Sequence, residues 1–196
     1  MNPSLLRYKK VKTVAGPIQL GVTAQGVALL CFSRSPSRHR NISPASDHRI
    51  TAAGQADRRR LETASRILQQ AEKALHAYFK GSYSALDRCP VDAAGTVFQK
   101  KVWRAMRRIP AGDTVSYGAL ARQIGRSGAA RAVGNACNQN PVCLMVPCHR
   151  IVGALGRLGG YAPGVRLKKV LLQHEGVRLT DVKNGRRTPS KPAKRN

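Results

Sequence analysis

The stretch "SYGALARQIGRSGAARAVGNACN", residues 116 to 138, predicts two short helices with a turn between them. Ser116 is a residue type that caps helix N-termini, so the first helix is expected over 116–125. A Gly-Arg-Ser turn follows, and the second helix is expected over 127–138. Two short helices about a glycine-containing turn of three or four residues outline a helix-turn-helix motif.

The second of these helices carries little side-chain bulk around one large cation, Arg131. Such a helix either approaches another surface closely or packs tightly inside the protein, and its residues alone leave both interpretations open. The charges favour the first, since residues 114–180 hold nine Lys and Arg and only one acidic residue, Glu175. The small residues are Gly128, Ala129, Ala130, Ala132, Gly134 and Ala136.

The whole chain is strongly basic, with 35 Lys and Arg against 9 Asp and Glu and a formal net charge of +26. A basic surface attracts nucleic acid, although anionic membranes attract it too, and the plain alternative is a well-solvated cationic protein. No apolar run approaches the roughly 20 residues that span a bilayer, and the N-terminus lacks the apolar stretch of a secretory signal. We therefore expect a cytoplasmic protein without a membrane partner.

The first part of the chain is expected to form a small α/β domain. Residues 16–33, "GPIQLGVTAQGVALLCFS", predict two strands about a Gln25-Gly26 turn, because that dipeptide tolerates positive φ. Residues 33–57 are rich in Ser, Pro, Arg and His and predict a mobile loop. A helix from Asp57 to the stop "KGS" at 80–82 is expected to bury a stripe at helical spacing. Its members are Leu61, Ala64, Leu68, Ala71, Leu75 and Tyr78.

A link containing Pro and Gly at 85–96 suggests two domains, over 1–92 and 93–180, in an α+β protein. The second domain is expected to open with a helix that ends at "PAGD", 110–113, and to close with a helix between Gly164 and Gly176. The tail at 181–196 is basic and is expected to be disordered, serving as a nonspecific DNA tether. The apolar positions of the opening helix are Phe98, Val102, Met106 and Ile109.

The stretch "NPVCLMVPCHRIVG", residues 140 to 153, places a cysteine beside a histidine. A free cysteine is usually a small buried hydrophobe, but a nearby base helps to form the nucleophilic thiolate. Because adjacent side chains on a strand point to opposite faces, Cys148 and His149 need a backbone turn to act together, and Pro147 makes one plausible. Asn140, before a proline, is either an ordinary turn residue or a hydrogen-bonding one.

Glu175 lies where the last helix ends, a position that costs a carboxylate about 0.3 to 1 kcal/mol through the helix dipole. The compensating partner is either a surface Arg or Lys, or His149, whose ring a carboxylate would orient as a base. Cys137 and Cys143 are interpreted as packing residues. No metal or other cofactor is expected, because the spacing from Cys143 to Cys148 exceeds a zinc knuckle and the five cysteines lack CxxC pairs.

These residues resemble the O6-alkylguanine-DNA alkyltransferases, also called methylated-DNA–protein-cysteine methyltransferases. The resemblance covers roughly residues 95–180 and, more loosely, the hairpin at 16–33 and "ALHAYFKG" at 74–81. It implies a ribonuclease H-like N-terminal domain and a winged helix-turn-helix C-terminal domain. The motifs are "NP" at 140–141, "VPCHRIVG" at 146–153, "AARAVGNA" at 129–136, "IPAGDTVSYGALA" at 109–121 and "LLQHEG" at 171–176.

The resemblance implies a DNA repair protein that acts once, with Cys148 taking the alkyl group from O6-alkylguanine and forming a stable thioether. O4-alkylthymine is a second lesion of the same kind. His149 would take the thiol proton through a water, Glu175 would orient His149, and Asn140 would hold the nucleophile's loop. Tyr117 would donate a proton to the leaving guanine.

The partner implied is double-stranded DNA, bound by a monomer through its minor groove with the damaged base flipped out. Arg131 would fill the gap in the stack, with Tyr117, Gly118 and Arg126 on the same DNA-binding surface. The substrate pocket would be lined by Tyr161, Ala162 and Pro163, of which Pro163 stands where many relatives have Gly.

Two other functions also fit parts of the pattern. A Cys, a His and a carboxylate compose the triad of cysteine hydrolases, which turn over and need an oxyanion hole. A DNA-binding regulator would keep the helix-turn-helix while Cys148 stayed merely buried. Transfer of one alkyl group per molecule separates both from the repair protein.

Overall fold

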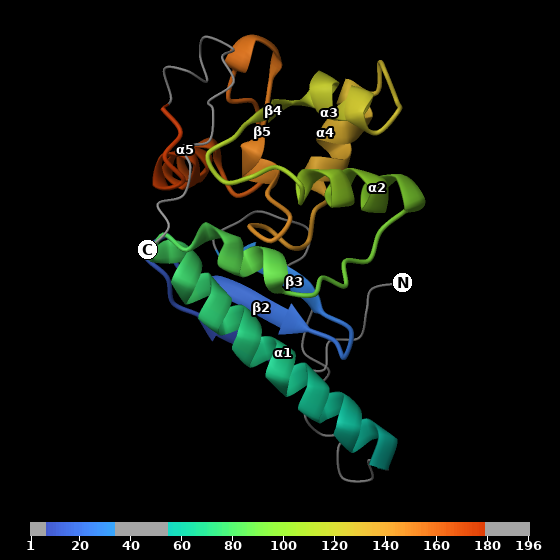
Figure 1. The fold of residues 1–196 in the computed structure, drawn as a ribbon, viewed down its shortest axis with the longest axis vertical. Helices are drawn as coiled ribbons and strands as arrows, with labels where there is room; N and C mark the ends of the chain where they lie inside the picture. Colours follow the sequence, from blue (N-terminus) through green and yellow to red (C-terminus); the bar gives the residue numbers. More distant parts are fainter. Residues whose placement is uncertain (1–6, 34–54, 179–196) are drawn as a thin grey trace. The chain divides into compact units, whose positions relative to one another are not determined.

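The structure, a computed structural model, describes residues 7–33 and 55–178 (Figure 1). Most of the expected loop at 33–57 and the whole tail at 181–196 lie outside these residues. The chain divides into two compact units, the first made of the part up to Thr96 together with Pro141–Met145, and the second of Val97–Asn140 together with the part from Val146. The domains expected from the sequence were 1–92 and 93–180, whereas this division begins the second unit at Val97 and places Pro141–Met145 in the first.

The first unit holds a three-stranded antiparallel sheet in the order β1-β2-β3. The predicted hairpin is confirmed as β2 and β3, which pair Leu20 with Leu30. The first strand was not predicted, because its sequence "RYKKV" is mostly cationic, yet it pairs Lys9 with Leu20 of β2. The strands are β1 Arg7–Val11, β2 Ile18–Val22 and β3 Val27–Phe32.

Gly26 ends the turn between β2 and β3, but not for the reason the sequence suggested. It has no positive φ. A Cβ at this position would instead lie 2.8 Å from the backbone of Pro90, whose carbonyl accepts a hydrogen bond from the N–H of Val27. The close approach of another chain segment, and not the turn conformation, requires glycine here.

The second edge of β3 is covered by two segments that come later in the chain. Val27 forms an isolated parallel bridge with Val91, and Leu30 forms one with Val142. The N–H of Leu30 donates to Pro141 O at 2.8 Å, and the N–H of Cys143 donates to Leu30 O at 2.7 Å. These bonds explain why residues 141–145 belong to the first unit, and they satisfy the backbone groups of a strand whose six residues are all buried.

Helix α1, Gln55–Phe79, runs across one face of this sheet (Figure 1). The predicted helix is confirmed, but its buried stripe is shifted, since Leu61 and Leu68 are only half-buried. Figure 1 shows the first turns of α1 extending past the strands, which leaves Leu61 little to pack against. The residues that α1 buries are Ala64, Ile67, Ala71, Ala74, Leu75 and Tyr78.

The second unit is mostly helical, with a short parallel pair of strands. Helices α2, α3 and α4 contact one another, and the Trp103 indole N–H donates to Ala136 O at 2.9 Å to join α2 to α4. Val115 of β4 pairs with Ile151 of β5. The elements are α2 Val97–Met106, β4 Val115–Ser116, α3 Tyr117–Gln123, α4 Ala130–Asn138, β5 Ile151–Val152 and α5 Val165–His174.

The two helices predicted from the opening stretch are present as α3 and α4. The cap is confirmed, because Ser116 Oγ accepts a hydrogen bond from the N–H of Ala119 at 3.1 Å. The second helix begins three residues later than predicted, since Gly128 has φ +86° and interrupts helical geometry. None of the helices within the described ranges combines the length and apolar content that crossing a bilayer requires.

Candidate active site

Cys148 opens a single 3₁₀ turn, Cys148–Arg150, that follows Pro147. This turn is the change of direction that the sequence analysis required, because it frees Cys148 and His149 from the alternation of a strand. All three residues of the turn are buried, and Cys148 has an exposed fraction of 6%. The thiol is thus close to the surface of the second unit but screened from bulk water.

Asn140 holds the turn from the end of the segment that follows α4. Its side-chain amide donates to Val146 O at 2.7 Å and to Cys148 Sγ at 3.3 Å. The amide therefore fixes the backbone before Cys148 and supplies an N–H to the sulfur. An N–H donor stabilises a thiolate more than a thiol, since the charged acceptor makes the stronger hydrogen bond. The hydrogen-bonding interpretation of Asn140 fits this geometry better than an ordinary turn residue does.

His149, the residue after Cys148, forms a buried pair with Glu175. His149 Nε2 lies 2.9 Å from Glu175 Oε1, and both side chains have no exposed surface. Among the described residues, His149 Nδ1 has no hydrogen-bond partner. When the Nε2–H donates to Glu175, Nδ1 keeps a lone pair that can take a proton.

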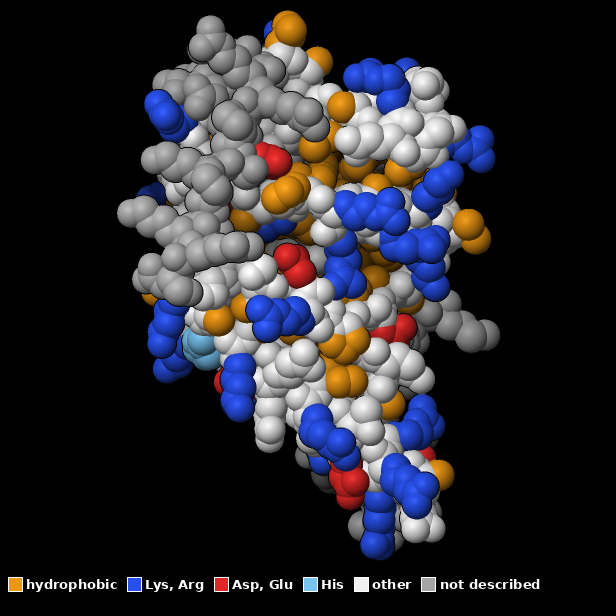
Figure 2. All heavy atoms as spheres, viewed as in Figure 1, with side chains coloured by type: hydrophobic (Ala, Val, Ile, Leu, Met, Phe, Trp, Pro, Cys, Tyr) orange, Lys and Arg blue, Asp and Glu red, His pale blue; other side chains and the backbone are white. Residues whose placement is uncertain are grey.

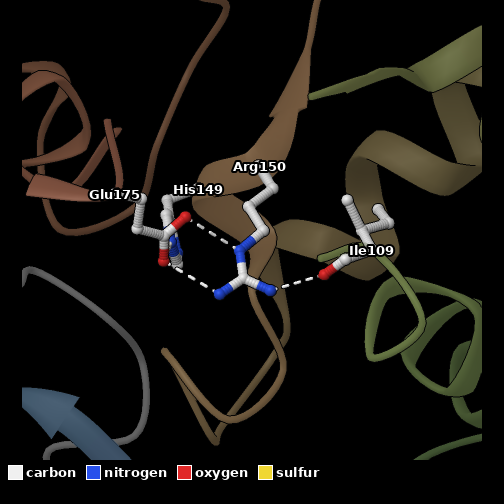
Figure 3. A network of polar contacts seen from close by, with 4 residues as sticks. All are labelled: Ile109, His149, Arg150 and Glu175. Atoms are coloured by element: carbon white, nitrogen blue, oxygen red, sulfur yellow. Dashed lines mark hydrogen bonds and ion pairs between the residues drawn. The ribbon is translucent and has the colours of Figure 1, made fainter. Parts of the chain in front are cut away.

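The compensating cation for Glu175 is Arg150, which is buried and not on the surface as the plain alternative supposed (Figure 3). Its guanidinium donates through Nε to Glu175 Oε2 and through Nη2 to Oε1, each at 2.9 Å. The remaining nitrogen, Nη1, donates to the carbonyl of Ile109. Figure 3 shows this fork reaching from Glu175 across to Ile109. Glu175 has two partners, and sequence reasoning found only His149.

These contacts set the charges of the pair. Burial lowers the pKa of His149, and the attraction of Glu175 opposes that shift only in part, so the ring is neutral at physiological pH. Burial alone would raise the pKa of Glu175, but the hydrogen bonds and charges of His149 and Arg150 outweigh it and hold the pKa well below its usual range. The site therefore contains a neutral imidazole beside an ionised carboxylate.

Lys168 is a functional candidate that the sequence analysis missed. It is fully buried, and its ammonium donates to the carbonyl oxygens of Ile151, Leu158 and Gly160. Burial lowers the pKa of Lys168 to about 8, and the electrostatic effect of the nearby Cys148 and Cys137 sulfurs opposes that shift. The available signal was a lysine on the inward face of α5, in helical register with Leu171 and Leu172. Lys168 ties the loop after β5 to the strand beside Cys148.

Tyr117 lies at the start of α3 in electrostatic range of the sulfur. Burial raises the pKa of Tyr117 to about 12, with further contributions from Cys137 and Cys148, so the phenol keeps its proton. A Cβ added at Gly159 would lie 3.3 Å from the Tyr117 ring, and one at Gly134 would lie 3.7 Å away. Two glycines therefore bound the ring from α4 and from the loop after β5.

A groove of about 540 Å³ lies between α3, α4 and the turn at Ala154. It brings together Tyr117, Gly118 and Arg131 of the predicted DNA-binding residues. Arg126 is exposed in the turn between the helices and is not among the residues that line this groove. Helix α4 both packs inside the protein and presents a face to solvent. Val133 and Ala136 are buried, whereas Arg131 and Ala132 are exposed.

The residues predicted to line a substrate pocket follow directly on this loop. Tyr161 is buried, and its ring meets the His149 ring edge-on at a centroid distance of 6.5 Å. Ala162 and Pro163 are half-buried in the turn before α5, which is closed by a hydrogen bond from Gly164 N–H to Tyr161 O. Tyr161 thus lies against the His149 ring, and Ala162 and Pro163 continue the chain toward α5.

The remaining cysteines are all buried. Cys137 Sγ lies 3.5 Å from Met106 Sδ, and burial followed by the charge of Cys148 raises the pKa of Cys137 above its ordinary value. Cys143 is buried in the first unit. Within residues 7–33 and 55–178, no group of three or more His, Cys, Asp or Glu side chains is placed to hold a metal ion.

Comparison with known proteins agrees with this geometry. Residues 97–177 match the family model described as "6-O-methylguanine DNA methyltransferase, DNA binding domain". A Shigella flexneri protein named methylated-DNA–protein-cysteine methyltransferase is 50% identical over 105 residues, which cover 54% of this chain and 61% of that protein. The chain therefore aligns with about three fifths of that relative's length.

Two further relatives extend the match. A Methanosarcina acetivorans protein of the same name is 47% identical over 110 residues, covering 56% of this chain and 70% of that protein. The crystal structure of Mycobacterium tuberculosis OGT in complex with DNA superposes with a TM-score of 0.65 at 32% identity, covering 89% of this chain and 98% of that one. Its mixed α and β content agrees with the two-domain α+β class expected here.

Proposed function

Because this chain belongs to the methylated-DNA–protein-cysteine methyltransferases, we propose that it repairs DNA by moving an alkyl group from O6-alkylguanine to Cys148, once per molecule. The observation that carries the proposal is the buried arrangement of Cys148, Asn140, His149 and Glu175. O4-alkylthymine is the second lesion that fits the same chemistry. A cysteine hydrolase or a non-catalytic regulator is not favoured by the relatives' names.

Activation of the sulfur begins with a neutral His149. The thiol proton passes to Nδ1, through a water, because Nε2 is committed to Glu175. The imidazolium that results is stabilised by the carboxylate, while Asn140 donates to the thiolate. This division of roles puts a base on one side of the sulfur and a hydrogen-bond donor on another.

The transfer is an in-line displacement at the alkyl carbon. The Sγ electron pair forms the S–C bond, the C–O6 bond breaks, and its electron pair returns to the guanine. The purine then takes one proton from the Tyr117 phenol, whose raised pKa keeps that proton in place until charge develops on the base. The phenolate regains a proton by way of His149, so the sum is one proton moved from the thiol to guanine. A thioether has no ready leaving group, which makes the protein spent.

Access to the lesion requires the nucleotide to leave the helical stack, at a cost of a few kcal/mol. Arg131 projects from α4 beside the groove that holds Tyr117 and Gly118 and would fill the gap left by the base. The small residues around Arg131 let α4 enter the minor groove, whose poor sequence information suits a protein that must act on any sequence. Arg126 would contact the backbone outside the groove.

The remaining parts of the proposal concern the units. The N-terminal domain, 1–92, is ribonuclease H-like, and the domain over 93–180 is a winged helix-turn-helix domain that binds DNA. The protein acts as a monomer in the cytoplasm, without a cofactor or metal and without a membrane partner. Tyr161, Ala162 and Pro163 line the base pocket, and the tail at 181–196 tethers the protein to DNA nonspecifically.

A labelled duplex tests this proposal. DNA carrying O6-[¹⁴C]methylguanine is incubated with protein in limiting amount, and the label that becomes acid-stable on the protein is counted against time. The expected result is a plateau at one label per molecule, absent from Cys148→Ala and unchanged in Cys137→Ala. Continued turnover, or no transfer by a folded protein that binds the duplex, would contradict the proposal.

A further inference from the structure

A second groove in the second unit has no part in the chemistry described above. It has a volume of about 630 Å³ and lies where the end of α2 faces the segment before β4 and the end of α3. Three cations from α2 and the residues just after it line it, Lys101, Arg104 and Arg108, and all three are exposed. Figure 2 shows Lys and Arg side chains gathered over α2.

The spacing of these cations follows from the helix. Positions 101, 104 and 108 are three and four residues apart, so they share one face, opposite the face that buries Val102 and Met106. At 1.5 Å per residue they extend over about 10 Å. One strand of duplex DNA presents about three phosphates over that length. The row of cations therefore matches one stretch of sugar–phosphate backbone in both charge and length.

The other lining residues agree with a phosphate ligand more than with a base or a peptide. The lining contains no aromatic ring on which an unpaired base could stack. Asp113 is the one carboxylate in it, and its Oδ1 is buried, so the cations dominate the exposed part.

Helix α3 separates this groove from the one beside Arg131. Arg122 lines the groove beside Arg131, whereas the next residue, Gln123, lines the groove that contains Lys101, Arg104 and Arg108. Successive residues of a helix point about 100° apart, so the two grooves open on different sides of α3. A straight duplex bound in the groove beside Arg131 therefore does not occupy the groove lined by Lys101, Arg104 and Arg108.

We propose that the groove lined by Lys101, Arg104 and Arg108 binds the backbone of a second duplex segment, so that one molecule holds two stretches of DNA at once. This inference rests on the proposed function, because it takes DNA as the ligand, and adds a site that the alkyl transfer does not need. A second site lets a repair protein pass directly from one segment to another without first dissociating. Search over a long genome would gain speed from such transfer.

Competition kinetics test the second site. The full chain is bound to a fluorescent duplex, unlabelled duplex is added in rising concentration, and the rate of release is followed by anisotropy. Direct transfer makes the release rate rise with competitor concentration. In Lys101→Glu/Arg104→Glu/Arg108→Glu the rate should become independent of competitor. In the unmodified protein, three phosphate contacts should give the affinity for the second duplex a salt slope of about −2.7, at about 0.9 per contact.

The matched control is Arg59→Glu/Arg66→Glu/Lys73→Glu on α1, which makes the same change in net charge at three exposed cations of the first unit. It should transfer between duplexes like the unmodified protein. Both variants should still take one label from a single short duplex, which separates failure of the second site from failure of the proposed function. A release rate independent of competitor in the unmodified protein, or equal losses in both variants, would overturn the inference. Acceleration by poly-glutamate as strong as by duplex would do so too, since the groove would then bind acidic protein segments.

Discussion

Cys137 and Cys148 belong to the same unit and are almost equally buried, with exposed fractions of 8% and 6%. Their neighbours differ. Cys137 packs against the Met106 thioether, and burial raises its pKa, whereas Cys148 receives an N–H from Asn140 and adjoins a histidine held by a carboxylate. Loss of water makes a thiol inert unless polar groups replace the water. The comparison teaches that the arrangement of donors and bases, and not exposure, separates the reactive sulfur from the packing one.

The largest effect should come from removing the base. His149→Ala should slow single-turnover alkyl transfer by about 10²- to 10⁴-fold, the usual contribution of a positioned general base. The rate is measured with protein in excess over a methylated duplex. His76→Ala, an exposed histidine of α1, is the control and should react at the normal rate. A rate unchanged by His149→Ala would mean that Cys148 differs from Cys137 for another reason.

Removing the carboxylate should cost stability as well as rate. Glu175→Gln leaves the buried Arg150 guanidinium without its ion pair, which should lower the free energy of unfolding by about 3 to 5 kcal/mol. The double variant Arg150→Met/Glu175→Gln removes both charges and should recover much of that stability in urea unfolding. Its transfer rate should stay low, because the imidazolium still lacks a carboxylate. Recovery of rate together with stability would reduce Glu175 to a partner of Arg150.

Asn140→Ala should make the surroundings of Cys148 more like those of Cys137. The sulfur and the Val146 carbonyl each lose the amide N–H, although the carbonyl keeps the N–H of Cys148. Stability should therefore fall by about 0.5 to 1.5 kcal/mol for each lost hydrogen bond. Alkylation of Cys148 by a soluble thiol reagent, followed by peptide mapping, should slow toward that of Cys137. Asn138→Ala changes an exposed neighbour and should leave both rates alone.

Gly159→Ala tests the support of Tyr117. The residue has φ +63°, and a methyl group would lie 3.3 Å from the ring, so we expect about 1 to 2 kcal/mol of backbone strain and a displaced phenol. Transfer should slow severalfold. Gly160→Ala is the matched control, because no atom lies within 4 Å of a Cβ built there. Equal rates for the two variants would show that Tyr117 does not need its present position.

The smallest effect concerns pH. The folded pKa of His149 lies below its ordinary value of 6.5, so below about pH 6.5 the unfolded chain binds more protons than the folded one. As the pH is lowered below about 6.5, the free energy of unfolding should therefore fall. The loss should be about 1.4 kcal/mol for each unit by which the folded pKa of His149 lies below the unfolded one. The depressed pKa of Glu175 adds a further loss as pH falls below about 4.5. A folded His149→Ala variant lacks the contribution of the histidine. Its free energy of unfolding in urea should therefore stay constant between about pH 6.5 and pH 5.

The sequence predicted the local features of the fold well. The cap at Ser116, the hairpin around Gln25 and the helix from Asp57 all rest on interactions between residues close in the chain. The contact of His149 with Glu175 was found because a carboxylate at a helix C-terminus needs a partner. A charged group whose own helix destabilises it thus predicted a contact with a distant residue.

The features that were missed depend on contacts between distant segments. The cationic strand β1 and the pairing of Leu30 with Val142 exist because the sheet needs partners for its edges, which no local pattern reports. Arg150 and Lys168 entered the sequence analysis only as two of the nine cations in residues 114–180, although both are buried and donate to acceptors that the fold brings together. The sequence does not distinguish a buried Arg or Lys from a solvated one.

The central claim is tested most directly by a peptide map of the protein after one encounter with a duplex carrying O6-methylguanine. Because no Lys or Arg lies between Arg131 and Arg150, Cys137, Cys143 and Cys148 share one tryptic peptide, and fragmentation of that peptide locates the methyl group. The account predicts one methyl group on Cys148 and none on Cys137 or Cys143. Methylation of Cys137, or repaired DNA with an unmodified protein, would contradict it.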